Sequence, residues 1–239
     1  MIIIPARLES TRFPKKVIAD IGGLPMVVRT AKQVLHLDDV CIATDSQEVI
    51  DICASYEIKA VLTSTTHKSG TDRINECASL LKLKDDELVI NLQADEPFIE
   101  PEVVEQMIQR LKKLQKDKNS FVMSSCYNAI NNETAQDPNL VKVILDSEQN
   151  AIYFSRSLIP YDRSGNANYF GHLGIYGFDK KSLHDFCTLD DAPIEDIEKL
   201  EQLRAIYHNK KISMVKVAST SFGIDTKEDL ERAKEIFLS

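Results

Sequence analysis

The first half of the chain alternates short apolar runs with longer segments whose apolar residues recur at helical spacing. The short runs are typical of strands buried on both faces of a sheet, and the longer segments are typical of the helices that cover it. In the second of these helices Asp45 is the expected N-cap, because Glu48 follows three residues later as in a capping box. The expected strands span residues 1–4, 40–44, 58–62 and 87–93, and the expected helices span residues 24–37, 45–56, 71–83 and 101–116.

The pattern changes after about residue 120. Several strand-like runs follow one another with no long helix between them, and a polar stretch over residues 161–171 precedes the fourth of them. We therefore predict an α/β protein with a parallel first half, about 1–120, and a second half, about 121–239, that carries a mixed sheet. The expected strands of the second half span residues 120–126, 140–146, 151–155, 172–178 and 212–217, and its expected helices span residues 180–187, 195–207 and 226–238.

Composition narrows the class of protein. The chain has 239 residues and a net charge of −8, so a general affinity for nucleic acid is not expected. No apolar run approaches the roughly 18 residues of a membrane-spanning helix, and we expect no membrane partner and no secretory segment. The five cysteines are scattered without a CxxC pair, which predicts free thiols in a reducing cytoplasm.

Cations gather directly after the first predicted strand. Arg7, Arg12 and Lys16 follow it at wide spacing, Lys15 is a fourth, and residues 10–19 contain no carboxylate. Open α/β sheets bind ligands at the carboxyl ends of their strands, and an acidic chain that binds an anion must concentrate its cations locally. The segment matches neither the dinucleotide glycine motif nor the Walker P-loop. It predicts a phosphate site made of side-chain cations and backbone amides, and the alternative interpretation is a set of solvated surface charges.

Carboxylates are expected at the same edge of the sheet. The fourth predicted strand ends in Asp95-Glu96-Pro97, where a carboxylate would repel bound phosphates unless a cation lay between them. Mg²⁺ suits this place, because it binds through one or two carboxylates together with substrate phosphates. Asp225, just before the last predicted helix, is a candidate second ligand. Both aspartates could instead be turn residues, and spacing alone does not decide between these interpretations.

Seven segments occur in a fixed order along nearly the whole chain, from Ile3 to about Lys234: IPARLESTRFPKK, THKSGTDR, NLQADEP, FSRSLIP, GHLGIYGF, LEQLR and GIDTKEDLERA. Their order and separation resemble those of the 3-deoxy-manno-octulosonate cytidylyltransferase family. The resemblance implies one Rossmann-like nucleotide-diphospho-sugar transferase domain over residues 1–239, with a mixed, mostly parallel sheet and a smaller C-terminal lobe. It also implies a cytoplasmic homodimer that joins CTP to the acid sugar 3-deoxy-D-manno-octulosonate (Kdo), releasing CMP-Kdo and pyrophosphate, for lipopolysaccharide biosynthesis.

The resemblance implies roles for individual residues on the nucleotide side. Arg7 and Lys16 match the arginine and lysine that meet the CTP phosphates. Ser69 and Arg73 match residues near the nucleotide, and Arg73 is a candidate contact of the cytosine ring. Asp95 matches the aspartate that holds Mg²⁺, and it is expected to be catalytic together with Arg7 and Lys16.

Further roles follow for the metal and the sugar. Asp225 matches the second carboxylate that completes the Mg²⁺ site. Among the residues expected to bind the sugar, Arg156 is the expected partner of the Kdo carboxylate, because a guanidinium fork suits that group. The residues expected on the sugar side are Gln93, Arg156, His172, Tyr176, Glu201 and Gln202.

The chain departs from the family pattern at three positions. Lys15 and Ala94 stand where the family often has glycine, and Gly171 stands where an arginine often precedes the histidine. The first two replacements are expected to be tolerated where the backbone does not require glycine. The third removes a cation from the sugar side and leaves the exact acid sugar open.

Structural interpretations compete with the functional ones on the sugar side. His172 could be a buried histidine with ordinary partners, and Tyr176 could be plain core. Glu201 and Gln202 flank an apolar line on the helix predicted over residues 195–207, so they could lie on its solvated side. That line runs through Ile194, Ile197, Leu200, Leu203 and Ile206.

Two functional alternatives stay open at this level. The acid sugar could be a sialic acid or an amino-substituted Kdo. The chain could also bind a nucleotide without catalysis, although the presence of both candidate metal ligands argues against this.

Overall fold

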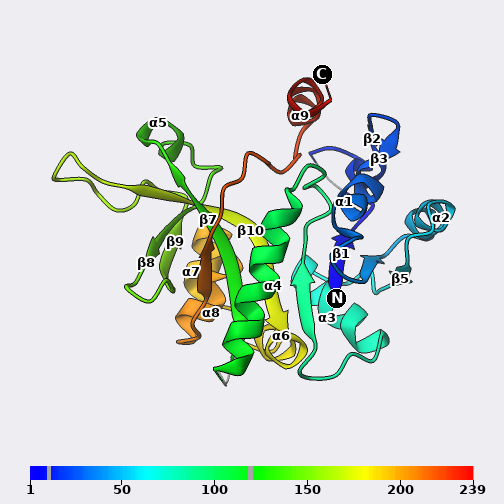
Figure 1. Ribbon diagram of the computed structural model, residues 1–239, viewed down its shortest axis with the longest axis horizontal. Coiled ribbons are helices and arrows are strands. Elements are labelled where there is room, and N and C mark those ends of the chain that lie inside the picture. Colours follow the sequence, from blue (N-terminus) through cyan, green and yellow to red (C-terminus); the bar gives the residue numbers. More distant parts are fainter. Residues whose placement is uncertain (10–11, 118–120, 239) are drawn as a thin grey trace. The chain divides into compact units, whose positions relative to one another are not determined.

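The computed structural model describes residues 1–9, 12–117 and 121–238, and its strands and helices form two compact units (Figure 1). The first unit comprises Met1–Glu105 and Ser219–Ser239, and the second comprises Gln106–Ala218. The sequence places the division near residue 120, whereas the structure groups the last stretch of the chain with the first. The segment that carries Asp225 therefore belongs to the same unit as the cationic loop.

The first unit is built on a parallel sheet of four strands in the order β6-β1-β4-β5. Its central strand β1 is buried along its whole length, as its unbroken apolar sequence predicts. β1 pairs in register with β4 from Ile2 opposite Val40 to Ala6 opposite Thr44, so both strands end at one edge. The strands are β1 (Ile2–Ala6), β4 (Val40–Thr44), β5 (Ala60–Leu62) and β6 (Leu88–Asn91).

Helices follow each strand, which confirms the predicted alternation in this unit. The structure adds short elements that no periodicity marks: a 3₁₀ turn, η1 (Lys16–Ile18), and a two-stranded hairpin of β2 (Asp20–Ile21) and β3 (Leu24–Pro25). The helices of this unit are α1 (Met26–Val34), α2 (Gln47–Ser55), α3 (Gly70–Leu80), the first residues of α4 (Pro101–Lys116) and α9 (Lys227–Phe237).

The predicted cap of α2 is wrong. Ser46 is the N-cap residue, and its side chain makes no capping hydrogen bond. The Asp45 carboxylate instead accepts hydrogen bonds from the Leu8 amide at 3.3 Å and from Arg73 Nη2 at 2.7 Å. A buried guanidinium competes for this carboxylate more strongly than a neutral backbone amide does.

Helix α9, red in Figure 1, packs beside the β2–β3 hairpin at the other end of the sequence. Its start carries a complete capping box between Thr226 and Asp229. Phe237 near its end stacks on Phe98 with ring centroids 4.5 Å apart. An apolar cluster joins the helix to the start of the chain, and its buried members are Phe13, Ile21, Met26, Ile224, Leu230 and Ala233.

The second unit carries the mixed sheet that the sequence predicts. β10 runs antiparallel to β7, with a register shift between Leu173 and Tyr176, while β11 runs parallel to β7. β8 pairs with β10 and, antiparallel, with β9. β7 continues to Ile130, beyond its predicted end at residue 126, and β10 begins at Tyr169, inside the stretch predicted to be polar loop. The strands are β7 (Met123–Ile130), β8 (Lys142–Leu145), β9 (Ala151–Ser155), β10 (Tyr169–Asp179) and β11 (Ser213–Lys216).

The helix predicted over residues 195–207 is in fact two helices. Lys199 adopts a left-handed conformation with φ 53° and ends the first of them, so the apolar line does not continue on one face. Ile197, one of its expected members, is 80% exposed. The helices of this unit are α5 (Asn132–Ala135), α6 (Lys180–Cys187), α7 (Pro193–Glu198) and α8 (Leu203–Tyr207), besides the later turns of α4.

Among residues 1–9, 12–117 and 121–238, we find no helix with the length and apolar character needed to cross a membrane.

Candidate active site

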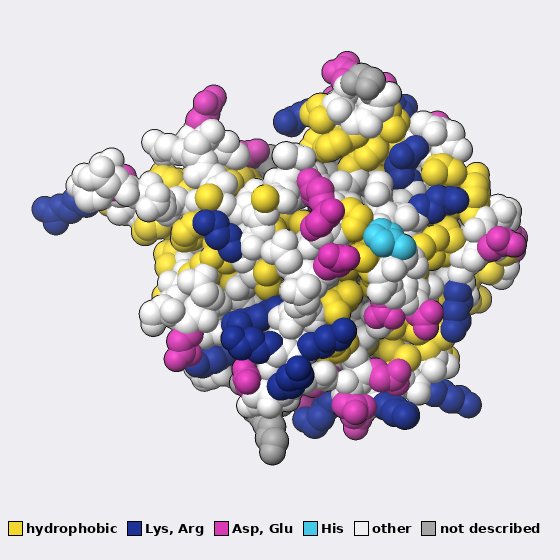
Figure 2. All heavy atoms as spheres, viewed as in Figure 1, with side chains coloured by type: hydrophobic (Ala, Val, Ile, Leu, Met, Phe, Trp, Pro, Cys, Tyr) yellow, Lys and Arg dark blue, Asp and Glu magenta, His cyan; other side chains and the backbone are white. Residues whose placement is uncertain are grey.

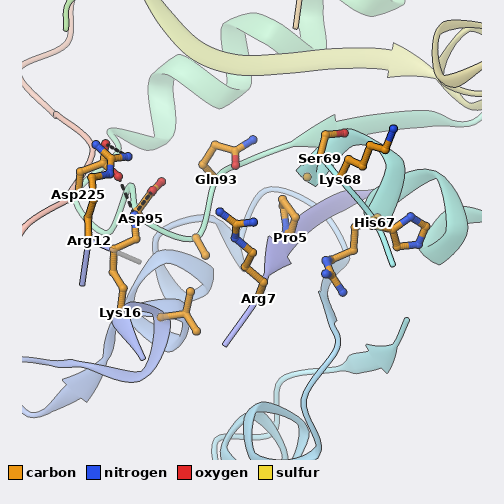
Figure 3. Close-up of a pocket in the computed structure, with 14 residues that line it drawn as sticks. Pro5, Arg7, Arg12, Lys16, His67, Lys68, Ser69, Gln93, Asp95 and Asp225 are labelled. Atoms are coloured by element: carbon orange, nitrogen blue, oxygen red, sulfur yellow. Dashed lines mark hydrogen bonds and ion pairs between the residues drawn. The ribbon is translucent and has the colours of Figure 1, made fainter. Parts of the chain in front are cut away.

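A cavity of about 350 Å³ opens in the first unit at the carboxyl ends of β1 and β6 (Figure 3). This is the edge at which open α/β sheets bind their ligands. Among the described residues, its lining holds five cationic side chains and two carboxylates in a protein whose net charge is −8. Figure 2 shows Lys and Arg side chains interspersed with Asp and Glu side chains over the face in view. The charged lining residues are Arg7, Arg12, Lys16, Lys68, Arg73, Asp95 and Asp225.

The loop after β1 directs its two lysines to different partners. Lys16 begins η1 and is 9% exposed, whereas the exposed Lys15 reaches Glu48 at 2.8 Å. Arg7 is exposed, and its guanidinium points toward Gln93 in Figure 3. The structure therefore places Lys16, and not Lys15, in the cavity, which is the register that the sequence predicts.

Lys15 differs from expectation in its backbone. It adopts φ 56° and ψ 28°, the left-handed region in which glycine is favoured. A lysine in this conformation costs on the order of 1 kcal/mol, so the replacement of the family's glycine here is not free of strain. Ala94 has no positive φ, and its carbonyl accepts a hydrogen bond from the Thr30 hydroxyl at 2.9 Å. The second departure is therefore tolerated as predicted.

The Lys16 ammonium lies between the two predicted metal ligands. Its Nζ atom is 2.6 Å from Asp95 Oδ2 and 2.9 Å from Asp225 Oδ1, and Arg12 Nη2 is 3.0 Å from Asp225 Oδ2. Burial opposes the charge of Lys16, but attraction to Asp95 and Asp225 outweighs it and raises the pKa of the ammonium. Burial likewise disfavours the Asp225 carboxylate, yet the hydrogen bonds and charges of Lys16 and Arg12 lower its pKa. Lys16 and Asp225 are therefore both charged at neutral pH.

Glu96 and Glu100 fasten the returning chain that brings Asp225 to this place. Glu96 accepts a hydrogen bond from the Ser221 hydroxyl at 2.8 Å, and Glu100 accepts one from the Ser219 hydroxyl at 2.7 Å. The Ile224 amide then donates to the Asp95 carbonyl at 2.9 Å. Removal from water, followed by the charge of Asp95, raises the pKa of Glu96 to about 8. Glu96 therefore adds little negative charge to the cavity at neutral pH.

The two aspartates fit a magnesium ion that takes its remaining ligands elsewhere. They already converge on one cation, the ammonium of Lys16. Among the described residues, no group of three or more His, Cys, Asp or Glu side chains is arranged to hold a metal. Mg²⁺ is usually bound through one or two carboxylates, with waters and substrate phosphates supplying the rest. Two carboxylates are therefore compatible with a magnesium ion whose other ligands come from water and a bound phosphate.

The segment 66–73 forms another wall of the cavity. Ser69 is the N-cap of α3, and its hydroxyl accepts a hydrogen bond from the Asp72 amide at 3.0 Å. A Cβ atom on Gly70 would lie 3.1 Å from Pro5 Cγ, so this glycine lets α3 approach β1 closely. Two lining residues that the sequence did not single out precede the cap, His67 and Lys68. Their place within the quoted THKSGTDR segment was the available clue.

Arg73 lines the cavity but is held firmly from behind. It is 3% exposed, and its guanidinium donates to Thr63 Oγ1 at 2.7 Å, to the Ser64 carbonyl at 3.2 Å and to Asp45 Oδ2 at 2.7 Å. These contacts fix its orientation. Its contact with a cytosine ring stays a prediction.

The expected sugar-side residues divide between the units. Gln93 lies in the first unit, where its amide donates to Asn91 Oδ1 at 3.1 Å. In the second unit, His172 is buried and its Nε2 is 2.7 Å from the Ser125 hydroxyl. Burial lowers the pKa of His172 to about 3, so the ring is neutral. The ring of Tyr176 lies 5.5 Å from it, and burial together with the charge of Glu201 raises the pKa of the phenol.

Glu201 and Gln202 lie in the turn between α7 and α8, and not on the side of a continuous helix. Gln202 is 3% exposed, which contradicts the interpretation of a solvated helix side for this residue. The break at Lys199 turns the segment inward after α7. Glu201 thereby comes near enough to Tyr176 to influence its pKa.

Arg156 is anchored by a residue that the sequence did not single out, Glu198. The Glu198 carboxylate accepts the Arg156 amide at 2.9 Å and the Ser155 hydroxyl at 2.6 Å, and its carbonyl accepts Arg156 Nε at 2.9 Å. The buried Lys142 ammonium donates to the Arg156 carbonyl at 2.7 Å. The contacts to its amide and its carbonyl fix the backbone of Arg156, and the contact to Nε orients its guanidinium. No local pattern marks Glu198, because it lies on a different element from Arg156.

Gly171 occupies a position with little room for a side chain. A Cβ atom there would lie 3.0 Å from Asn128 Oδ1 and 3.0 Å from Ile130 Cγ2. An arginine at this position would require these neighbours to move. The packing around residue 171 is therefore matched to glycine in this chain.

Known proteins resemble this chain over nearly its whole length. The family model described as cytidylyltransferase matches residues 1–212. The 3-deoxy-manno-octulosonate cytidylyltransferase of a Nitratiruptor species is 53% identical over 237 residues, which cover 99% of each chain. The enzyme of the same name from Helicobacter pylori is 53% identical over 242 residues, which cover 99% of this chain and 97% of the relative.

A solved structure agrees. That of CMP:2-keto-3-deoxy-manno-octonic acid synthetase complexed with CTP is 36% identical, covers 99% of this chain and 97% of its own, and superposes with a TM-score of 0.91. This likeness confirms the predicted nucleotidyltransferase fold with its mixed, mostly parallel sheet. The chain belongs to the 3-deoxy-manno-octulosonate cytidylyltransferase family.

Proposed function

We propose that the protein joins CTP to Kdo, giving CMP-Kdo and pyrophosphate, in the cytoplasm and for lipopolysaccharide biosynthesis. The observation that carries this proposal is the cationic cavity with its Lys16–Asp95–Asp225 cluster. It occurs in a chain that is 53% identical, over nearly its whole length, to relatives of that name. The buried free cysteines suit a reducing compartment.

The cavity residues would act mainly by holding charges in place. In the proposed reaction the anomeric hydroxyl of Kdo attacks the α-phosphorus of CTP in line, and pyrophosphate leaves. Arg7 and Lys16 would contact the phosphates and neutralise the charge that develops on pyrophosphate. Asp95 and Asp225 would hold Mg²⁺, which when bound supplies electrostatic stabilisation of the reacting phosphate. Catalysis of this kind depends on positioning and charge stabilisation.

The sugar carboxylate needs a cation that is not already neutralised by the triphosphate. Arg156 is the proposed partner, since Glu198 and Lys142 fix its backbone and Glu198 also orients its Nε atom. A preoriented guanidinium loses less entropy when it binds a carboxylate. His172 is neutral and buried, so it would contribute a hydrogen bond and not a charge.

Homodimer formation is also proposed. Four large apolar side chains of the second unit are more than half exposed: Ile152, Tyr161, Ile197 and Tyr207, at 51%, 88%, 80% and 51%. A dimer would remove some of this apolar surface from water. Sedimentation equilibrium should give about twice the chain mass of 27.0 kDa, and a mass equal to one chain at micromolar concentration would contradict the dimer.

The proposed reaction is tested by pyrophosphate release across the four ribonucleoside triphosphates and a panel of acid sugars. The panel contains Kdo, its amino-substituted analogue and a sialic acid. We expect release with CTP and Kdo above every other pair. If the analogue is preferred, the reaction is still a nucleotidyl transfer from CTP, and the tight packing at Gly171 is part of a site that prefers the analogue to Kdo. If no pair releases pyrophosphate, the proposal fails.

Asp95→Asn should lower turnover about a hundredfold or more, because the amide keeps the shape of the carboxylate but loses a charge expected on the metal. Asp225→Asn should act in the same direction. Asp51→Asn is the matched control, since Asp51 is an exposed aspartate of α2. Steady-state pyrophosphate release with excess Mg²⁺ measures the effect. A folded Asp95→Asn protein with near-normal turnover would remove Asp95 from the metal site.

Arg156→Ala should raise the apparent KM for Kdo and leave the KM for CTP nearly unchanged. A charge-assisted contact corresponds to about 1.5–3 kcal/mol, or roughly a tenfold to hundredfold change. Arg156→Lys should recover only part of the loss, because lysine keeps the charge but not the fork. Arg163→Ala, at an exposed position, is the control. Equal effects on both substrates in a protein with normal thermal unfolding would place Arg156 elsewhere.

A further inference from the structure

Lys16 is already bound to the oxygen atoms that a metal ion needs. Its ammonium has three donors, and two of them lie on Asp95 Oδ2 at 2.6 Å and Asp225 Oδ1 at 2.9 Å. Arg12 covers the other Asp225 oxygen, Oδ2, at 3.0 Å. Side chains of the same loop therefore neutralise the two carboxylates.

This arrangement conflicts with the roles proposed for the same residues. A divalent cation held by Asp95 and Asp225 would compete with the ammonium for these carboxylates, and two cations repel each other at close range. One of its three donors is left for a phosphate, but Lys16 and a metal ion would compete for the same two carboxylates. Binding of a metal ion to both carboxylates is therefore an alternative to the arrangement in the structure.

We infer that Lys16 is a resident counterion of Asp95 and Asp225. When a nucleotide binds, the Lys16 ammonium moves from these carboxylates to the nucleotide phosphates, and only then are the carboxylates open to a metal ion. The inference rests on the proposed function, because it takes the metal ligands and the phosphate ligand from it. Metal ion and nucleotide then bind with positive coupling, and each raises the affinity for the other by the same factor.

The surroundings of Lys16 suit such an exchange. Asp225 is 43% exposed and Arg12 is 67% exposed, so water and ligand reach the outer side of the cluster. Among the described lining residues, the five cations outnumber the two carboxylates. Cationic side chains can therefore turn toward a bound triphosphate. Lys16 would exchange the carboxylate oxygens for phosphate oxygens, so its positive charge would stay balanced by negative charge. Lys15 takes no part, because it is paired with Glu48.

Binding of Mn²⁺ without nucleotide, followed by electron paramagnetic resonance, tests the inference. Lys16→Met removes the charge and keeps the length of the chain. It should bind Mn²⁺ about tenfold more tightly than the unaltered protein, the change expected for one charge-assisted contact. Lys15→Met, the matched neighbour, and Lys16→Arg, which keeps the cation, should resemble the unaltered protein. Equal or weaker Mn²⁺ binding by folded Lys16→Met would overturn the inference.

Asp95→Asn combined with Lys16→Met separates this inference from the proposed function. The combined variant should lose the gain in Mn²⁺ affinity, because the carboxylate that the gain requires is gone. If the gain persists, the ion binds elsewhere and the inference fails. If Lys16→Met alone brings no gain while Asp95→Asn still abolishes turnover, the exchange is wrong and the metal assignment stands.

A second measurement follows Lys16 in the unaltered protein. With ¹³C at lysine Cε, the Lys16 resonance is assigned as the one absent from the spectrum of Lys16→Arg. CTP added in the presence of EDTA should shift this resonance, since the ammonium leaves Asp95 and Asp225, and should leave that of Lys15 in place. An unmoved Lys16 resonance at saturating CTP would show that the ammonium stays on the carboxylates.

Discussion

The charge balance among Lys16, Asp95 and Asp225 is the constraint on which the arrangement of the first unit depends. Two partly exposed carboxylates approach each other at the carboxyl edge of a parallel sheet, and a cation between them offsets their mutual repulsion. Lys16 supplies it from a loop that leaves β1, and Arg12 adds a second contact from the outside. The cluster thus ties three distant parts of the chain together, namely the opening loop, the end of β6 and the segment before α9.

The return of the chain after the second unit is what makes this cluster possible. Residues 219–224 cross back along Glu100, Glu96 and the backbone of Asp95 through specific hydrogen bonds, and α9 then locks into an apolar cluster beside the β2–β3 hairpin. The Asp95-Glu96-Pro97 motif therefore has divided roles. Asp95 faces the cavity, while Glu96, whose pKa burial raises to about 8, holds the crossing segment.

The sequence predicts the repeating elements well, because strand burial and helix amphipathicity are local properties. It also places the cationic loop and the DEP turn at one sheet edge, since all parallel strands end there. It fails where long-range partners decide the local structure. Asp45 has the sequence of a cap, but the Arg73 guanidinium takes its carboxylate. The apolar line after Ile194 predicts one helix, but the left-handed Lys199 divides it, and no periodicity marks such a residue.

The second unit shows why residue identity alone does not define a substrate site. Arg156 could be named from its motif, yet its orientation depends on Glu198 in α7 and on Lys142 in β8, neither of which lies near it in sequence. Gly171 could be named as a departure, yet only the neighbouring Asn128 and Ile130 show that an arginine does not fit there without repacking. The absence of an arginine at residue 171 therefore depends on the packing between the two paired strands, β7 and β10. In the proposed reaction, specificity for the acid sugar would therefore depend on how firmly the guanidinium of Arg156 is held.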